Sequence, residues 1–198
     1  MKTPDGLSPP GSAKTSGSAK ALLAFTSRQA THSDIPFLHD VMKASIGKLQ
    51  DGFLTDAQVK ASFELMGMDT QLIEDGTYFA ILSGDTFVGC GGWSMRATLF
   101  GANHTKGRDP ALLDPLTDAA RIRAMYTHPS WARRGIGQMI MDLCENEAIK
   151  HGFKRFELMA TLSGEPLYRK CGYMPVSYEN VPTSLGVDVP LIKMEKHA

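Results

Sequence analysis

Residues 131–144, WARRGIGQMIMDLC, restrict the fold of this chain more than any other segment. Two arginines and two glycines precede apolar residues that recur at helical spacing. Residues 121–127 before the segment and 154–160 after it are rich in apolar and β-prone side chains, so both read as strands. The pattern predicts a strand, a glycine-bearing loop, a helix and a second strand, which is a unit typical of α/β proteins.

The glycines at the start of this helix suggest an anion site. The first N–H groups of a helix have no acceptor within it, and glycine lets an anion approach the backbone closely. Arg133 and Arg134 add positive charge. The nucleotide-binding pattern GxxxxGK[ST] is absent, and Ile140 stands where a dinucleotide fingerprint needs its third glycine. A pyrophosphate in another setting fits the loop, and a structural turn with solvated arginines is the alternative.

The other elements follow from capping residues and periodicity. A proline after Ser33 and Asp34 predicts a helix start, and Thr55 with Gln58 forms a capping-box pattern for a second helix. Further predicted elements are a hairpin of strands 78–82 and 86–90, which bends and continues through 89–93, an irregular excursion over 96–118, a short helix at 166–170 and a last strand at 187–194. We therefore expect an α/β fold with a mixed central sheet flanked by helices.

Composition narrows the function classes. The 198 residues carry 21 basic and 21 acidic side chains, so the net charge is zero, unlike that of a general nucleic-acid or membrane-surface binder. No apolar run approaches the roughly 18 residues of a membrane span. The odd number of cysteines, Cys90, Cys144 and Cys171, indicates reduced thiols and a cytoplasmic protein. Residues 1–24 read as a disordered tail, with an organelle-targeting peptide as the alternative, and 25–198 as one domain.

The loop and two further segments resemble the GNAT-type N-acetyltransferases. That family has Gln/Arg-x-x-Gly-x-Gly/Ala between a strand and a helix, and the chain has Ala132 to Gly137 there, after the segment MYTHP. The segment TLSGEPLYRKCGY is similar to the family pattern of a tyrosine four residues before a Gly-aromatic pair, with Tyr168 in that position. Ala132 and Thr161 depart from the usual Gln/Arg and Asn, so neither receives a role. The resemblance covers roughly residues 25–198 and implies a single GNAT-like domain.

The resemblance implies transfer of an acetyl group from acetyl-CoA to a primary amine of a small molecule or peptide. Two central strands would part to admit the cofactor arm, which would pair with the main chain of Met125, Tyr126 and Thr127. The pyrophosphate would bind the amides of the loop and first helical turn, which comprise Arg133, Arg134, Gly135, Ile136, Gly137 and Gln138. The Tyr168 hydroxyl would protonate the departing thiolate, and a packing role for this ring is the alternative.

The sequence leaves several points open. Some family members carry a Glu base on the strand before the loop, but this strand has Arg121 and Arg123, which read as ion-pair partners or as attractants for an anionic acceptor. Water, Asp109, Asp118 or an already neutral amine could take the role of base. Trp93 reads as core rather than as pocket wall. The six histidines share no ligand spacing, so we expect no metal.

Three function classes remain in competition. An acetyltransferase leads, a non-catalytic CoA-binding regulatory module is the alternative, and a nucleic-acid binder using Arg133 and Arg134 is disfavoured by the zero net charge. A homodimer stays open, and nothing in the sequence identifies the acceptor amine.

Overall fold

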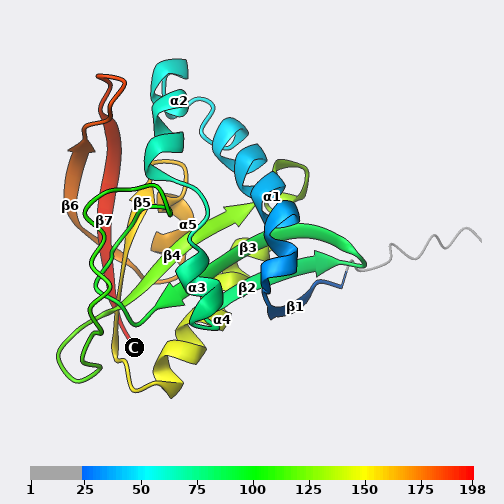
Figure 1. Ribbon diagram of the computed structural model, residues 1–198, viewed down its shortest axis with the longest axis vertical. Coiled ribbons are helices and arrows are strands. Elements are labelled where there is room, and N and C mark those ends of the chain that lie inside the picture. The colour runs from blue at the N-terminus through cyan, green and yellow to red at the C-terminus, as the bar shows by residue number, and fades with distance from the viewer. Residues whose placement is uncertain (1–23) are drawn as a thin grey trace, which may run out of the picture.

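Seven strands form one twisted sheet in the computed structural model, which describes residues 24–198 (Figure 1). The spatial order is β1-β2-β3-β4-β5-β7-β6, and only β4 and β5 run parallel. The strands are β1 Thr26–Gln29, β2 Tyr78–Ser83, β3 Thr86–Ser94, β4 Ala120–Thr127, β5 Arg155–Thr161, β6 Met174–Val181 and β7 Val189–His197. The predicted tail, 1–24, lies outside the described residues except for Ala24.

Helices cover both faces of the sheet. Helices α1 (Ile35–Lys48), α2 (Asp56–Leu65) and α3 (Thr70–Glu74) lie on one side, and α4 (Ile136–Lys150) and α5 (Glu165–Lys170) lie on the other. Single-turn 3₁₀ helices precede α1 and follow β4 at His32–Asp34 and Pro129–Trp131. Within residues 24–198, no helix combines the length and the apolar character of a membrane span.

The core is divided by the sheet into two layers. Ile140 of α4, Trp93 of β3 and Phe156 of β5 belong to the layer beneath α4, whereas Leu38 of α1 and Leu72 of α3 belong to the other layer. Trp93 is only 1% exposed, so its interpretation as a core residue is confirmed. This arrangement holds α4 and the loop before it against the middle of the sheet.

Local signals located most of the elements. Thr55 caps α2 by accepting a hydrogen bond from the Gln58 amide, and the Gln58 side chain accepts from the Thr55 amide, as the capping box predicts. The excursion over 96–118 is irregular, as expected, with one bridge between Arg96 and Leu112. The predicted mixed α/β architecture in one domain is confirmed.

Three elements were missed. Strand β1 has four residues, α3 has five, and β6 contains Pro175 at the sheet edge and presents outward faces at alternate positions. Such short or proline-bearing segments carry little periodic signal, and their partners in the sheet decide their conformation. The predicted last strand is also displaced, because β7 begins at Val189 rather than at residue 187 and continues to His197.

Candidate active site

An opening divides the sheet between β4 and β5. The two strands pair only through Ala120 with Phe156 and Arg121 with Glu157, and they diverge beyond these residues. A β-bulge in β4 accompanies the divergence, with Ala124 at a φ of 50° and the register to β3 shifted between Cys90 and Gly92. The parting of the two central strands that the sequence led us to expect is therefore present.

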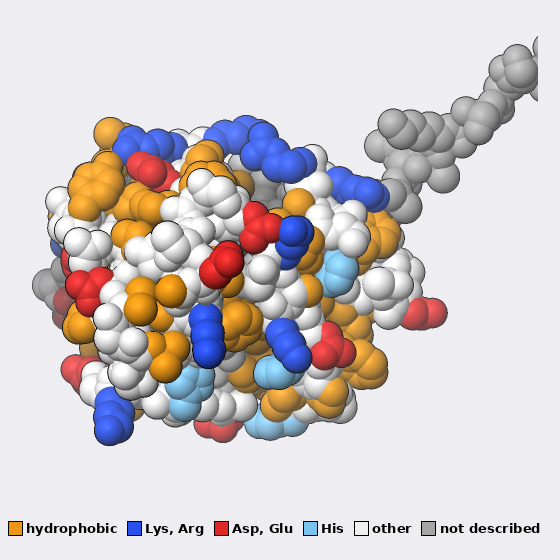
Figure 2. Space-filling view, turned by 90° about the horizontal axis from the view of Figure 1, so that it is seen from above, with side chains coloured by type: hydrophobic (Ala, Val, Ile, Leu, Met, Phe, Trp, Pro, Cys, Tyr) orange, Lys and Arg blue, Asp and Glu red, His pale blue; other side chains and the backbone are white. Residues whose placement is uncertain are grey.

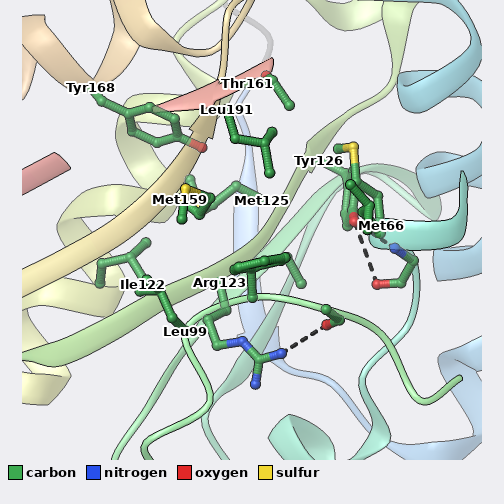
Figure 3. A pocket seen from close by; sticks show the side chains of 15 residues that line it. Met66, Leu99, Ile122, Arg123, Met125, Tyr126, Met159, Thr161, Tyr168 and Leu191 are labelled. Carbon is green, nitrogen blue, oxygen red and sulfur yellow. Dashed lines mark hydrogen bonds between the residues drawn. The ribbon is translucent and has the colours of Figure 1, made fainter. Parts of the chain in front are cut away.

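A pocket of about 80 Å³ lies at this divergence (Figure 3). Its walls come from β4 (residues 122–126), β5 (Met159 and Thr161), α5 (Tyr168) and β7 (Leu191), together with segments 65–67 and 99–101. Figure 3 shows Tyr168, Met66 and Leu99 at three separate edges of this space, with Met125 and Met159 between Tyr168 and Leu99. The pocket is thus continuous from the loop-bearing side of the sheet to the side covered by α2 and the excursion.

Tyr168 places its hydroxyl in this pocket. The side chain is 9% exposed, and its hydroxyl has no hydrogen-bond partner among the described residues. Figure 3 shows the oxygen directed toward the middle of the pocket. Burial raises the pKa of Tyr168 above its usual range, so the hydroxyl stays protonated at neutral pH. A protonated, unpartnered hydroxyl can donate a hydrogen bond to a group that enters the pocket.

The loop before α4 presents free backbone donors. Arg133 and Gly135 have φ values of 62° and 89°, and this left-handed conformation favours glycine at the second position. No hydrogen-bond acceptor within residues 24–198 faces the amides of Ile136, Gly137 or Gln138. A β-carbon at Gly135 would lie in open space. The loop therefore forms a concave, positively polarised backbone site suited to an anion.

Two neighbouring contacts shape this loop. The Arg134 guanidinium stacks on the Trp131 ring at 4.9 Å and donates to the Ser130 carbonyl at 3.2 Å. Gly137 also has a packing function, because a β-carbon there would lie 2.7 Å from Cδ2 of Leu167. Its missing side chain allows α5 to approach α4. Gly137 therefore couples the loop to the short helix that carries Tyr168.

The three β4 residues that we predicted to contact the cofactor arm do not all line the pocket. Met125 and Tyr126 line the pocket, whereas Thr127 pairs with Gly89 on β3 and lies outside the wall. The Tyr126 hydroxyl accepts a hydrogen bond from the Gly67 amide at 2.9 Å. Its side chain thus ties β4 to the segment after α2, which leaves only its main chain for a ligand.

A buried ion cluster lies beside the pocket. The Asp69 carboxylate contacts Nη2 of Arg108 at 2.5 Å and Nη1 of Arg123 at 2.6 Å. The Asp69 side chain is fully buried and that of Arg123 is 3% exposed, while Arg123 also donates to the Gly101 carbonyl. Arg121 pairs with Glu157. The interpretation of Arg121 and Arg123 as ion-pair partners is therefore confirmed.

Neither carboxylate considered as a general base reaches the pocket. Asp109 accepts a hydrogen bond from the Ala111 amide, and Asp118 accepts one from the Asp114 amide, so both stabilise turns of the excursion. Within the described chain, Arg123 is the one charged residue of the pocket wall. Neither Asp109 nor Asp118 therefore lies where it could take a proton from a group inside the pocket.

Sequence reasoning did not identify the apolar wall residues. Met66, Leu99, Phe100, Met159 and Leu191 come from four separate parts of the chain and share no motif. Thr161, to which we assigned no role, also lines the pocket, where its hydroxyl accepts a hydrogen bond from the Gly164 amide. Only tertiary contact brings these residues together.

The face of the molecule shown in Figure 2 has no broad basic patch among the residues that the structure describes. Several Lys and Arg side chains follow one edge of this view, and both signs of charge mix with apolar side chains across the rest. This distribution agrees with the zero net charge of the sequence.

The fold is similar to that of known acetyltransferases. A GCN5-related N-acetyltransferase from Rhodopseudomonas palustris aligns with a TM-score of 0.63 at 18% identity, over 87% of this chain and 95% of that one. A ribosomal-protein-alanine N-acetyltransferase from Brucella melitensis aligns with a TM-score of 0.59 at 15% identity, over 87% and 99%. The PaiA N-acetyltransferase from Thermoplasma acidophilum, in complex with coenzyme A, aligns at 0.57 with 13% identity, over 88% and 99%.

Sequence comparison assigns the family directly. No curated protein sequence matches the chain. The profile described as the Acetyltransferase (GNAT) family matches residues 46–173, which include the diverging strands, the loop before α4 and Tyr168. The chain therefore belongs to the GNAT acetyltransferase family.

Proposed function

We propose that this chain is an acetyl-CoA-dependent N-acetyltransferase that acts on a primary amine of a small molecule or a peptide. One observation carries the proposal: the unpartnered Tyr168 hydroxyl faces the pocket where β4 and β5 diverge, and the free amides at the start of α4 belong to a turn that packs against α5, the helix of Tyr168. One structural relative was determined with coenzyme A bound, and two others are named as ribosomal-protein alanine N-acetyltransferases.

The cofactor would be held by main-chain groups. The amides from Arg133 to Gln138 would bind its pyrophosphate, because helix N-termini and left-handed turns concentrate N–H donors. Arg133 and Arg134 would add charge to this contact. Beyond Arg121, β4 has no pairing to β5, so the main chain at Met125, Tyr126 and Thr127 offers an edge to the amide-bearing pantetheine arm.

The chemistry would be a direct transfer. The neutral amine nitrogen attacks the thioester carbonyl carbon, a C–N bond forms and the C–S bond breaks. The leaving thiol has an ordinary pKa of about 8.5, so protonation by the Tyr168 hydroxyl would assist its departure. The proton lost by the acceptor nitrogen passes to water, and water also restores the tyrosine proton. No Asp or Glu of the described chain lines the pocket, which is why we assign no side-chain base.

Cofactor binding tests the proposal. Acetyl-CoA at a hundredfold excess over its dissociation constant should stabilise the protein by about 2.7 kcal/mol, measured as a rise in Tm. Gly135→Val should abolish this rise, because the new side chain would occupy the space before the free amides and strain a φ of 89°. Gly84→Val is a matched control, since Gly84 also has a positive φ, 58°, and open space around it. Equal Tm shifts in both variants would refute the loop assignment.

Turnover separates the enzyme from a regulatory module. A screen of amines should release free thiol from acetyl-CoA and give acetylated products by mass spectrometry. Binding of acetyl-CoA without thiol release from any amine would favour the non-catalytic module.

Two further expectations stay predictions. The cytoplasmic location rests on Cys90, Cys144 and Cys171, which are free thiols in the structure. Cell fractionation would test it. Light scattering of the purified protein would show whether it forms a homodimer.

A further inference from the structure

We infer that the acceptor is a weakly basic primary amine attached to an apolar group, and that it enters the pocket as the neutral amine. The inference rests on the proposed function and specifies its substrate class. It follows from the apolar side chains of the pocket wall and from its charge, since the wall described contains Arg123 and no carboxylate.

Apart from Tyr168, Thr161 and Arg123, the pocket wall is formed largely by apolar side chains. Leu65 and Met66 come from the end of α2, Leu99 and Phe100 come from the excursion, and Leu191 comes from β7. Figure 3 shows Met66 and Leu99 apart from the Tyr168 ring, Met66 beside Tyr126 and Leu99 beside Ile122, so these side chains would face the acceptor rather than the thiol. An acceptor with an apolar group beside its amine would be favoured here, because the contact removes apolar surface from water.

The electrostatics of the pocket oppose a cation. Arg123 is the one charged residue described in the pocket wall, and it shares the Asp69 carboxylate with Arg108. Neither Asp69 nor Arg108 lines the pocket, so the charged group that an acceptor would meet in the wall itself is a guanidinium. Desolvation and a nearby like charge both lower the pKa of an amine and disfavour its ammonium form. An ammonium group would find no carboxylate in this wall among the described residues. The pocket therefore selects the neutral form before the reaction starts.

Amines differ greatly in how much neutral form they supply. An α-amino group next to a carbonyl has a pKa of about 7.7–8.0, whereas an alkylamine resembles lysine at about 10.4. At pH 7.5 about one third of the first and roughly one thousandth of the second is neutral. Because the pocket has no side-chain base among the described residues, kcat/KM should be proportional to the fraction of the acceptor that is neutral in solution.

Four acceptors test the two requirements separately. Leucinamide and the peptide Leu-Gly-Gly carry a weakly basic amine beside an apolar group. Compared with leucinamide, 3-methylbutylamine keeps the apolar group but is strongly basic, and serinamide keeps the weak base but lacks the apolar group. At pH 7.5 we expect kcat/KM for leucinamide or Leu-Gly-Gly to exceed both of the others by at least about tenfold. Faster acetylation of Leu-Gly-Gly than of leucinamide would identify a peptide N-terminus as the source, and the reverse would identify a small amine.

The pH profile supplies an independent measurement. Below its pKa, kcat/KM for 3-methylbutylamine should rise about tenfold per pH unit, whereas the value for leucinamide should level off above about pH 8. The advantage of leucinamide should therefore shrink at high pH.

Introduction of a carboxylate should reverse the selection. Leu99→Glu places an acid in the wall, and an opposite charge stabilises an ammonium group by about 1–3 pKa units, so the rate of 3-methylbutylamine relative to leucinamide should rise at least about tenfold. Leu112→Glu is the matched control, because Leu112 lies in the same excursion, is 68% exposed and does not line the pocket. Its acceptor ratio should equal that of the unchanged protein.

Three results would overturn the inference. The first is that 3-methylbutylamine or serinamide is acetylated as efficiently as leucinamide. The second is that the rate ratio of 3-methylbutylamine to leucinamide is unchanged in a Leu99→Glu protein that still binds acetyl-CoA. The third is that the protein binds acetyl-CoA but acetylates none of the four amines. Failure to bind acetyl-CoA would instead overturn the proposed function itself.

Discussion

Removal of one oxygen, by Tyr168→Phe, should separate catalysis from packing. The hydroxyl has no hydrogen-bond partner among residues 24–198, so its loss breaks no contact within the fold. The ring would keep its edge contact with Tyr173, whose centroid lies 6.3 Å away. We therefore expect a change in Tm below about 2 °C, because the loss of a typical hydrogen bond would itself shift Tm by only a few degrees in a domain of this size.

The rate should respond very differently. Positioned acid catalysis contributes about 10²–10⁴ in rate, so kcat with an identified acceptor should fall by at least about a hundredfold. The acetyl-CoA dissociation constant should change little, because the lost interaction forms chiefly in the transition state. Steady-state kinetics and calorimetric titration give the two quantities.

A matched variant sharpens the interpretation. Tyr173→Phe removes a hydroxyl from a fully buried ring of the same core cluster that does not line the pocket, so its turnover per folded molecule should stay near normal. The acid role would be falsified if Tyr168→Phe kept more than about half of its turnover. In that case Tyr168 would serve only for packing.

The structure supports three further predictions. Arg134→Ala should weaken CoA binding about tenfold or more, because a charge-assisted hydrogen bond contributes about 1.5–3 kcal/mol, and it should leave the binding of phosphate-free pantetheine unaffected. Calorimetric titration measures both affinities. Equal losses for the two ligands would show that the arginine acts only through its stacking on Trp131. Asp69→Ala should lower the free energy of unfolding, measured by urea titration, by about 3–5 kcal/mol, because it leaves the charge of the buried Arg123 uncompensated. A loss below about 1 kcal/mol would contradict a stabilising role of this buried ion pair. Hydrogen bonds from Arg28 hold the pKa of Asp34 well below its usual range, so its stabilisation is complete above the unfolded-state pKa of about 3.9 and is lost as the pH falls below that value. Asp34→Asn should flatten this acid limb of the stability curve, and an unchanged limb would argue against the pair.

The chain itself contains the local signals of its fold. Thr55 and Gln58 form a capping box from neighbouring residues, and the helix after Gly137 shows its apolar period directly in the sequence. The glycine-rich loop likewise depends on few residues, since its free amides arise from the start of one helix. Such features depend on contacts between residues only a few positions apart in the chain, so the sequence determined them. The motifs that resemble the GNAT family were also visible in the sequence.

Tertiary contacts decided the remainder. The pairing of β4 with β5 stops after Arg121, and this end point depends on the whole sheet. The packing function of Gly137 became visible only with Leu167 beside it, thirty positions along the chain. The pocket wall joins Met66, Leu99 and Leu191, and apolar residues of this kind look the same in a sequence whether they fill a core or line a cavity. Its charge balance depends on Asp69 and Arg123 meeting from distant segments. The sequence determined the loop before α4 and its free amides, because these depend on neighbouring residues, and the assembly of remote side chains decided the shape and polarity of the pocket.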